Sequence, residues 1–211
     1  MEVQGEIYMG RVIGIVSIFL MFTGISIAGW NVYQWWQSQQ SVHQLQTIEV
    51  PEITVETEHK QKTELKTNSN FSTLQMNEST GDQVAELIIP ELGLSYDVYW
   101  GTDENTLTEG VGMYVSEWTS VPNHLGGHTV LSGHRDTVFT GLGDLETGDL
   151  LHVKYKGELF QYQINKTWIT DPDDRTVIIE KEESTLTLTT CYPFQYFGPA
   201  PERYIVQAEQ I

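Results

Sequence analysis

The 211-residue sequence contains a single cysteine, Cys191, so no internal disulfide can form and a small disulfide-stapled fold is excluded. Basic residues are also scarce, with 11 Lys and Arg against 29 Asp and Glu and a formal net charge of −18. Nucleic acids and anionic lipid surfaces bind clustered cations, so neither is expected as the main partner. Most of the acidic residues are interpreted as a solvated surface.

Long apolar runs are also absent, with one exception. Residues 12–29 carry no charge over about 18 positions, which is near the minimum for a membrane-spanning helix. The aromatic stretch WNVYQWW follows, as in an interfacial belt. We expect a transmembrane anchor at 12–36 after a cytoplasmic N-terminus at 1–11, because the nearby cation, Arg11, precedes the run. A cleavable signal peptide ending near Ala28 is the alternative, although the run is longer than a usual signal core.

Residues 37–82 are rich in Gln, Ser, Thr, Glu and Lys, and they offer few apolar side chains for burial. We expect a polar spacer, partly disordered. In residues 83–211, short runs of β-branched and aromatic residues alternate with turn residues, which predicts one all-β domain. The expected strands are AELIIP, YDVYW, HTVLS, DLLHVKY, FQYQINKTWI, TVIIE, TLTLTTC and RYIVQAE, with short helices at 106–114 and 137–145.

The stretch TLTLTTCYPFQYFGPAPERYIV places Arg203 twelve positions after Cys191. The loop between the two expected strands contains three prolines and a glycine, which keep it from continuing either strand. If these strands pair antiparallel in symmetric register, Cys191 and Arg203 face each other with Cβ atoms roughly 5 Å apart. The guanidinium then favours the thiolate and offers donors to an oxygen that becomes negative during acyl transfer. A lone cysteine in a strand is more often a small buried hydrophobe, so the pattern alone leaves both interpretations open.

An acyl-transfer thiol requires a general acid–base group, and His134 is the first candidate. It follows Gly133 at the end of an expected strand in GGHTVLSGHRDT, where a side chain can reach a cleft. His124 and His128 are competing candidates. Arg135, directly after His134, could orient the histidine or shape the cleft, with an exposed salt bridge as the simpler alternative.

The histidines and Cys191 could instead be zinc ligands. However, residues 128 and 134 are six positions apart in extended chain, roughly 20 Å, which is too far for a shared ion. His124 and His128 would supply only two ligands. The acidic DPDD at 171–174 lacks calcium-loop spacing and is typical of a solvated turn. We therefore expect no metal and no cofactor.

These motifs resemble those of the sortases, the membrane-anchored cysteine transpeptidases of Gram-positive bacteria. TLTTC fits the TLxTC signature, Cys191 and Arg203 have the family's spacing, and GHR at 133–135 fits the catalytic-histidine segment. IIPELGL, GDLLHV and RYIVQAE are similar to the opening, middle and closing strands, so the resemblance covers 84–211. SGHRDT and the TLTTC stretch look most like class D. The lid and the second apolar stretch usual in the pilin-polymerising class are not visible, which disfavours pilus assembly.

The resemblance implies an eight-stranded sortase-like β-barrel with short helices, and a defined reaction. Cys191 would attack an LPxTG-like sorting signal and form a thioacyl enzyme, and an amine of peptidoglycan or its lipid-linked precursor would release the protein. His134 would be the acid and later the base, and Arg203 the positioning and oxyanion-stabilising group. The loop between Cys191 and Arg203 would line the substrate groove. The protein would then be a single-pass membrane protein with an extracellular catalytic domain. A tethered binding domain without chemistry and a cysteine hydrolase are the competing functions.

Overall fold

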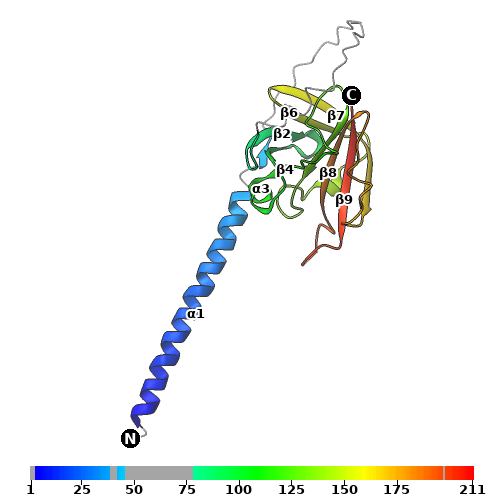
Figure 1. Ribbon diagram of the computed structural model, residues 1–211. Coiled ribbons are helices and arrows are strands. Elements are labelled where there is room, and N and C mark those ends of the chain that lie inside the picture. Colours follow the sequence, from blue (N-terminus) through cyan, green and yellow to red (C-terminus); the bar gives the residue numbers. More distant parts are fainter. Residues whose placement is uncertain (1–2, 39–41, 46–77, 197) are drawn as a thin grey trace, which may run out of the picture.

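The computed structural model describes residues 3–38, 42–45, 78–196 and 198–211, which form one long helix and a β-domain (Figure 1). In chain order the elements are α1 (Val3–Ser38), β1 (Val42–Gln44), β2 (Gln83–Ile89), η1 (Pro90–Leu92), β3 (Leu94–Trp100), α3 (Glu104–Glu109), β4 (Val111–Met113), β5 (Gly127–Ser132), η2 (Leu142–Asp144), β6 (Leu150–Tyr155), β7 (Glu158–Thr170), β8 (Ser184–Tyr192) and β9 (Glu202–Gln210).

The strands form a closed barrel. Their order is β1-β3-β2-β6-β7-β9-β8-β5-β4, and β4 also pairs with β3, so the eight strands β2–β9 close on themselves. The β3–β4 and β5–β8 pairs are parallel, whereas the other neighbours in this order are antiparallel. The expected eight-stranded barrel is therefore confirmed, with β1 added beside β3.

Alternation along the strands fills the barrel with apolar side chains. In β2, Ala85, Leu87 and Ile89 are buried in the core, and the residues between them are more exposed. Because successive side chains of a strand point to opposite faces, this pattern places every second residue inside. The rings of Tyr96 and Phe139 meet edge to face inside the core, with centroids 5.9 Å apart.

The prediction of a strand at TVIIE is wrong. Residues 176–180 form no strand and lie in the loop between β7 and β8. Val177 is nevertheless buried, and the Ile179 carbonyl lies 2.7 Å from Nδ1 of His128 on β5. The apolar residues of this loop pack onto the barrel without joining the sheet, which a pattern of alternating hydrophobicity cannot distinguish from a strand.

The expected helix at 106–114 is shorter and lies nearer the N-terminus. Asp103 sets the start of α3, because its carboxylate accepts hydrogen bonds from the backbone amides of Asn105 and Thr106. The helix ends before Gly110, and the chain continues as β4 between β3 and β5. The second expected helix, at 137–145, is reduced to the single turn η2.

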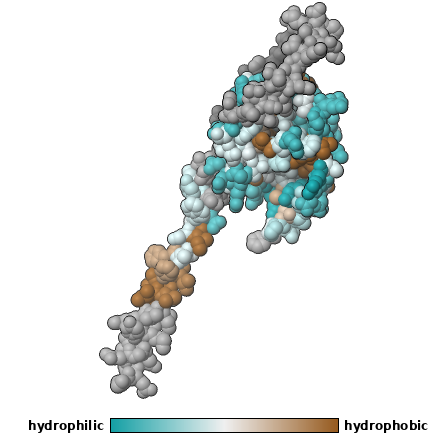
Figure 2. Space-filling model, in the orientation of Figure 1, coloured by the Kyte–Doolittle hydropathy of each residue, from teal (hydrophilic) through white to brown (hydrophobic). Residues whose placement is uncertain are grey.

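Helix α1 is a candidate membrane span. Its Ile15–Tyr33 segment has 19 residues, a mean hydropathy of 1.8 and no buried share, so it is long and apolar enough to cross a bilayer. Figure 2 shows these side chains as a brown band between the grey helix end and the β-domain. The helix begins before the expected anchor at 12–36 and ends just beyond it.

A short strand lies within the expected spacer at 37–82. Val42–Gln44 forms β1 and pairs antiparallel with β3. Nε2 of His43 lies 3.2 Å from a carboxylate oxygen of Asp97, and the amide of Leu45 donates to the Gly93 carbonyl at 2.9 Å. The chain just after α1 is thus attached to the barrel, while residues 39–41 and 46–77 of the spacer lie outside the described residues.

Candidate functional site

Cys191 and Arg203 are directly paired residues of the antiparallel β8–β9 ladder. The symmetric register considered from the sequence is present, and paired residues point to the same face with Cβ atoms roughly 5 Å apart. On β8, Leu186, Leu188 and Thr190 are buried, with the two leucines in the core cluster. Because side chains alternate along a strand, Thr187, Thr189 and Cys191 point to the outer face of the barrel. Thr187 is buried there, and Cys191 is half-buried.

The guanidinium of Arg203 uses part of its hydrogen-bond donors within the protein. Its Nη1 donates to the carbonyl of Glu202 at 3.0 Å. A guanidinium has five N–H donors in a planar fork, so donors remain for a group bound at Cys191. On its other side β9 pairs with β7, where Thr170 is the partner of Arg203.

His134 follows β5, which runs parallel to β8. The last residue of β5, Ser132, is paired with Thr189, and the next amide, that of Gly133, donates to the Thr189 carbonyl at 3.2 Å. His134 and Cys191 each lie two positions beyond this last pair, Ser132 and Thr189. The parallel register thus brings the backbone that leads to His134 next to the end of β8, and Arg203 lies on the neighbouring strand β9.

The turn after β5 depends on close packing at Gly133. A Cβ there would lie 2.6 Å from Cγ2 of Val138 and 2.8 Å from Cδ2 of Phe139, closer than carbon atoms approach. The backbone then turns, and the amide of Phe139 donates to the carbonyl of His134 at 2.9 Å. Buried apolar side chains thus lie directly beneath the histidine backbone and fix its position.

The competing candidate His128 is a buried structural residue. Its Nδ1 is 2.7 Å from the Ile179 carbonyl, and its Nε2 is 2.8 Å from Oγ1 of Thr187. Burial lowers the pKa of His128 because the charged imidazolium loses its hydration. Both ring nitrogens are occupied, which leaves no free nitrogen for proton transfer to a substrate.

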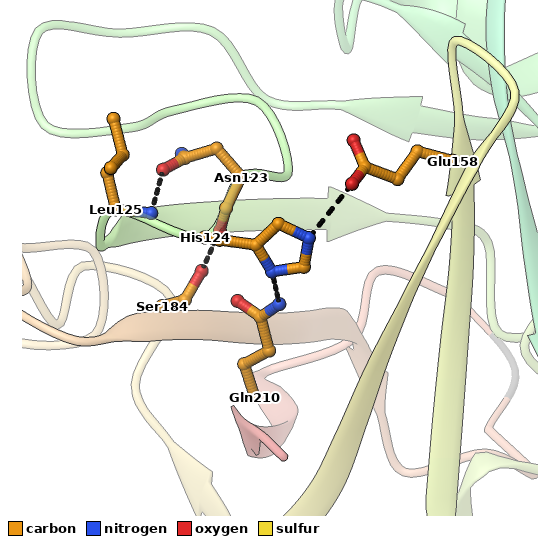
Figure 3. Close-up of polar contacts among 6 residues, drawn as sticks. All are labelled: Asn123, His124, Leu125, Glu158, Ser184 and Gln210. Atoms are coloured by element: carbon orange, nitrogen blue, oxygen red, sulfur yellow. Dashed lines mark hydrogen bonds and ion pairs between the residues drawn. The ribbon is translucent and has the colours of Figure 1, made fainter. Parts of the chain in front are cut away.

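The other competing candidate, His124, lies beside Asn123, whose carbonyl accepts from Ser184 at the start of β8 (Figure 3). Its Nε2 is 3.0 Å from Oε1 of Glu158, and its Nδ1 contacts the side-chain amide of Gln210. The neighbouring Asn123 carbonyl accepts from Ser184, the first residue of β8, whereas Cys191 lies near the end of that strand. His124 is therefore separated from the cysteine by almost the full length of the strand.

A cavity of about 750 Å³ lies between two loops near the β5–β8–β9–β7 strands. One wall begins at Tyr114, whose amide donates to the carbonyl of Val130 on β5 at 2.9 Å. The other wall begins at Pro172, two positions after Thr170, the partner of Arg203. The lining residues are Tyr114, Trp118, Pro172, Asp173, Asp174, Arg175, Ile178, Ile179 and Glu180.

This cavity was not predicted from the sequence, although the sequence contains one feature that indicates it. Trp118 lies in the polar stretch SEWTS and is 50% exposed, which is unusual for a large aromatic side chain. Part of the opposite wall is the segment 176–180, which the hydrophobic pattern predicts as a strand, so the pattern conceals that this wall is a loop. The loop between Cys191 and Arg203 was expected to line the substrate groove, but its aromatic side chains differ in their surroundings. Phe194 packs against the core, and Tyr196 is 48% exposed.

The acidic turn at 171–174 satisfies its own hydrogen bonds. The amide of Asp173 donates to the carboxylate of Asp171 at 2.8 Å, and hydrogen bonds from Thr170 and Thr176 lower the pKa of Asp174. Within the described part of the chain, no group of three or more His, Cys, Asp and Glu residues is placed to hold a metal ion.

Comparison with known proteins gives consistent matches. The family model described as "Sortase domain" matches residues 87–211. Sortase D of Bacillus subtilis (strain 168) is 33% identical over 199 residues, covering 93% of this chain and 98% of that protein. The catalytic domain of SrtD from B. anthracis is 55% identical with a TM-score of 0.57, covering 65% of this chain and 92% of that one. A sortase D5 transpeptidase of Clostridium perfringens is 26% identical with a TM-score of 0.57, covering 69% and 89%.

Proposed function

This chain belongs to the sortase family of cysteine transpeptidases, and we propose that it cleaves an LPxTG-like sorting signal and transfers the protein to a peptidoglycan amine. The similarity to two class D sortases favours this class. The observation that carries the proposal is the pairing of Cys191 with Arg203, beside the strand end that leads to His134. In the proposed site, a thiol, an imidazole and a guanidinium act together on one substrate carbonyl.

In the first step, the Cys191 thiolate attacks the carbonyl carbon at the scissile bond of the sorting signal. The carbonyl oxygen becomes negative, and the Arg203 guanidinium donates hydrogen bonds to it. His134, as the imidazolium, gives its proton to the departing amine nitrogen. The C–N bond breaks, the C–S bond remains, and the product is a thioester on Cys191.

In the second step, an amine of peptidoglycan or its lipid-linked precursor attacks the thioester carbonyl. His134, now neutral, takes the proton that the amine loses. Arg203 again stabilises the tetrahedral oxyanion, and its collapse expels the Cys191 thiolate. The enzyme returns to its starting protonation state, and the surface protein is joined to the acceptor by a new amide bond.

The cavity and the helix support this reaction. One wall of the cavity begins two positions after Thr170, the partner of Arg203. Its lining includes the apolar Tyr114, Trp118 and Ile179, which suit the apolar residues of a sorting signal, besides acidic residues and Arg175. A membrane anchor, with the N-terminus inside and the catalytic domain outside, holds the site near emerging proteins and lipid-linked amines. Tethering raises the effective concentration of both substrates.

Product analysis tests the proposal directly. The full chain in detergent is incubated with an LPxTG-type peptide, with and without an amine acceptor, and products are identified by mass spectrometry. Amine addition should divert the product from hydrolysis to ligation. If hydrolysis persists unchanged at saturating amine, transfer is not the main activity.

Three alanine variants assign the roles. Cys191→Ala should abolish turnover, and His134→Ala should reduce it by orders of magnitude. His124→Ala is the matched control, because it removes an imidazole from the far end of β8. Equal loss in both histidine variants would contradict the assignment of His134. A Cys191 that a thiol-alkylating reagent never modifies in the folded protein would favour a binding domain without chemistry.

A further inference from the structure

Arg135 directly follows His134, and the reaction described above does not use it. Its guanidinium turns toward the loop that joins β8 to β9, residues 193–201. Nη1 donates to the carbonyl of Pro193 at 2.9 Å. Nη2 donates to the carbonyls of Tyr196 and Gly198, each also at 2.9 Å. One side chain thus gathers three carbonyl groups of the same loop.

The planar fork of arginine explains why this contact fixes a shape. Carbonyls from three different positions of the loop must point at one guanidinium, and such charge-assisted hydrogen bonds are stronger than neutral ones. The Arg135 guanidinium also lies over the Tyr196 ring, 5.7 Å from its centroid. These partners differ from the exposed salt bridge considered from the sequence, because they are backbone oxygens 58 to 63 positions along the chain.

A second attachment holds the first part of the same loop. Phe194 packs against the core, and its ring lies 5.2 Å from that of Tyr204 on β9. Gly143 makes room for it, since a Cβ there would lie 2.7 Å from Cε2 of Phe194. Beyond Phe194, the residues Gln195, Tyr196 and Gly198 are exposed. The contacts of Arg135 therefore hold the exposed part of the loop, which the core does not reach.

We propose that Arg135 is a positioning residue that holds the β8–β9 loop against the end of β5, so that the loop forms a fixed wall of the sorting-signal groove. The role of the loop as a groove wall rests on the proposed function. The attachment of the loop by the three hydrogen bonds of Arg135, which we call the clamp, does not. The loop begins two positions after Cys191 and ends two positions before Arg203. Its attachment next to His134 joins the segments of all three proposed catalytic residues, without Arg135 touching the substrate.

The clamp is tested without any substrate. Hydrogen exchange is followed in the full chain in detergent for the amides of Gln195, Tyr196 and Gly198. Arg135→Ala should speed exchange at these amides by about tenfold or more, since even one hydrogen bond to a charged group stabilises by that factor. Arg135→Lys should give an intermediate rate, because an ammonium cannot reproduce the fork. Lys154→Ala, which removes a positive charge from an exposed position on β6, is the control and should change nothing there.

Steady-state kinetics test the groove wall. A loosened wall weakens peptide binding more than the chemical step, so Arg135→Ala should raise KM for the sorting peptide with a smaller change in kcat. Arg135→Lys should recover part of the loss. A fall in kcat with KM unchanged would overturn the positioning role and make Arg135 part of the chemistry.

The two tests fail independently. Unchanged loop exchange in both Arg135 variants would overturn the clamp, whatever the enzyme's substrate is. If the wild-type protein does not turn over LPxTG-type peptides, the proposed function fails, while faster loop exchange in Arg135→Ala would still establish the clamp. A variant that fails to fold is recognised by faster exchange throughout the barrel, and Arg135→Lys then carries the test.

Discussion

The hydroxyl of Thr190 donates a buried hydrogen bond of 2.7 Å to the carbonyl of Gly133. Thr190 directly precedes Cys191, and Gly133 directly precedes His134. The bond therefore ties together the two backbone positions that carry the proposed nucleophile and the proposed acid. It continues the contact between β5 and β8 beyond the last paired residues, Ser132 and Thr189.

Replacing Thr190 with valine should reduce both stability and turnover. Valine keeps the shape of threonine but leaves the Gly133 carbonyl without this donor, a loss of about 1–3 kcal/mol in the free energy of unfolding. Because the backbone before His134 is then less constrained, kcat/KM should fall by roughly tenfold or more. Denaturant unfolding and peptide kinetics measure the two effects.

Thr187→Val provides the matched control for this prediction. Thr187 is equally buried on β8, and its hydroxyl is hydrogen-bonded to His128, well before the strand reaches Cys191. This variant should show a similar loss of stability with little change in kcat/KM. If both variants lose the same activity, the effect of Thr190 is general destabilisation and not positioning.

Gly133→Ala should distort the same turn from the inside. The added methyl group would collide with Val138 and Phe139, and overpacking of this kind costs about 1–3 kcal/mol. His134 should shift, so peptide turnover should fall even at temperatures where the variant is folded. Gly141→Ala is the control, because its Cβ would meet only the tip of Leu92, at 3.2 Å. A fully active Gly133→Ala enzyme would show that this turn tolerates displacement.

The sequence predicted an all-β domain and the neighbouring positions of Cys191 and Arg203 because both depend on local, periodic signals, whereas the eight-stranded barrel was implied by the resemblance to sortases. Strand alternation has a period of two, and a symmetric hairpin fixes which residues oppose each other. The parallel β5–β8 pairing carries no such signal. It joins Ser132 to Thr189 across more than fifty residues, so sequence patterns could nominate His134 but could not predict that the strand before it pairs with β8.

The partners of Arg135 and the loop at 176–180 could not be predicted for a related reason. In both cases a segment packs against another that is distant in the sequence, and this packing does not change the local hydrophobic pattern. The sequence TVIIE has strand propensity, yet the barrel offers it no free edge here, and Val177 is buried in a loop instead. Backbone carbonyls, which Arg135 binds, are present at every residue and leave no mark in a sequence.

Arg203→Lys should retain the fold and lose most of the activity. Lysine keeps the positive charge opposite Cys191 but concentrates it at one point, so it cannot present two parallel donors to an oxyanion. The loss of one oxyanion donor corresponds to about 10²–10³ in kcat. Peptide kinetics measure this loss, and the circular dichroism spectrum should stay unchanged. A lysine variant that keeps most of its rate would contradict the oxyanion role.

The buried His128 should make the barrel less stable in mild acid. Its pKa is lowered in the folded state by burial, whereas in the unfolded chain it is near the ordinary value of about 6.5. The unfolded state therefore binds more protons below that pH, and stability falls as the pH drops from about 6.5 toward the lower folded-state pKa. One such group contributes at most about 1.4 kcal/mol per pH unit, because a one-unit change in pKa corresponds to that energy.

Substitution separates this contribution from that of the other histidines. Burial also lowers the pKa of His152, so the wild-type slope contains both. His128→Gln should be less stable at pH 8, because its hydrogen bonds to Thr187 and Ile179 are altered, yet its stability should depend less steeply on pH between 6.5 and 5. The free energy of unfolding, measured from tryptophan fluorescence at several pH values, gives the slopes directly. Parallel lines for the wild type and His128→Gln would mean that His128 is not kept neutral by the fold.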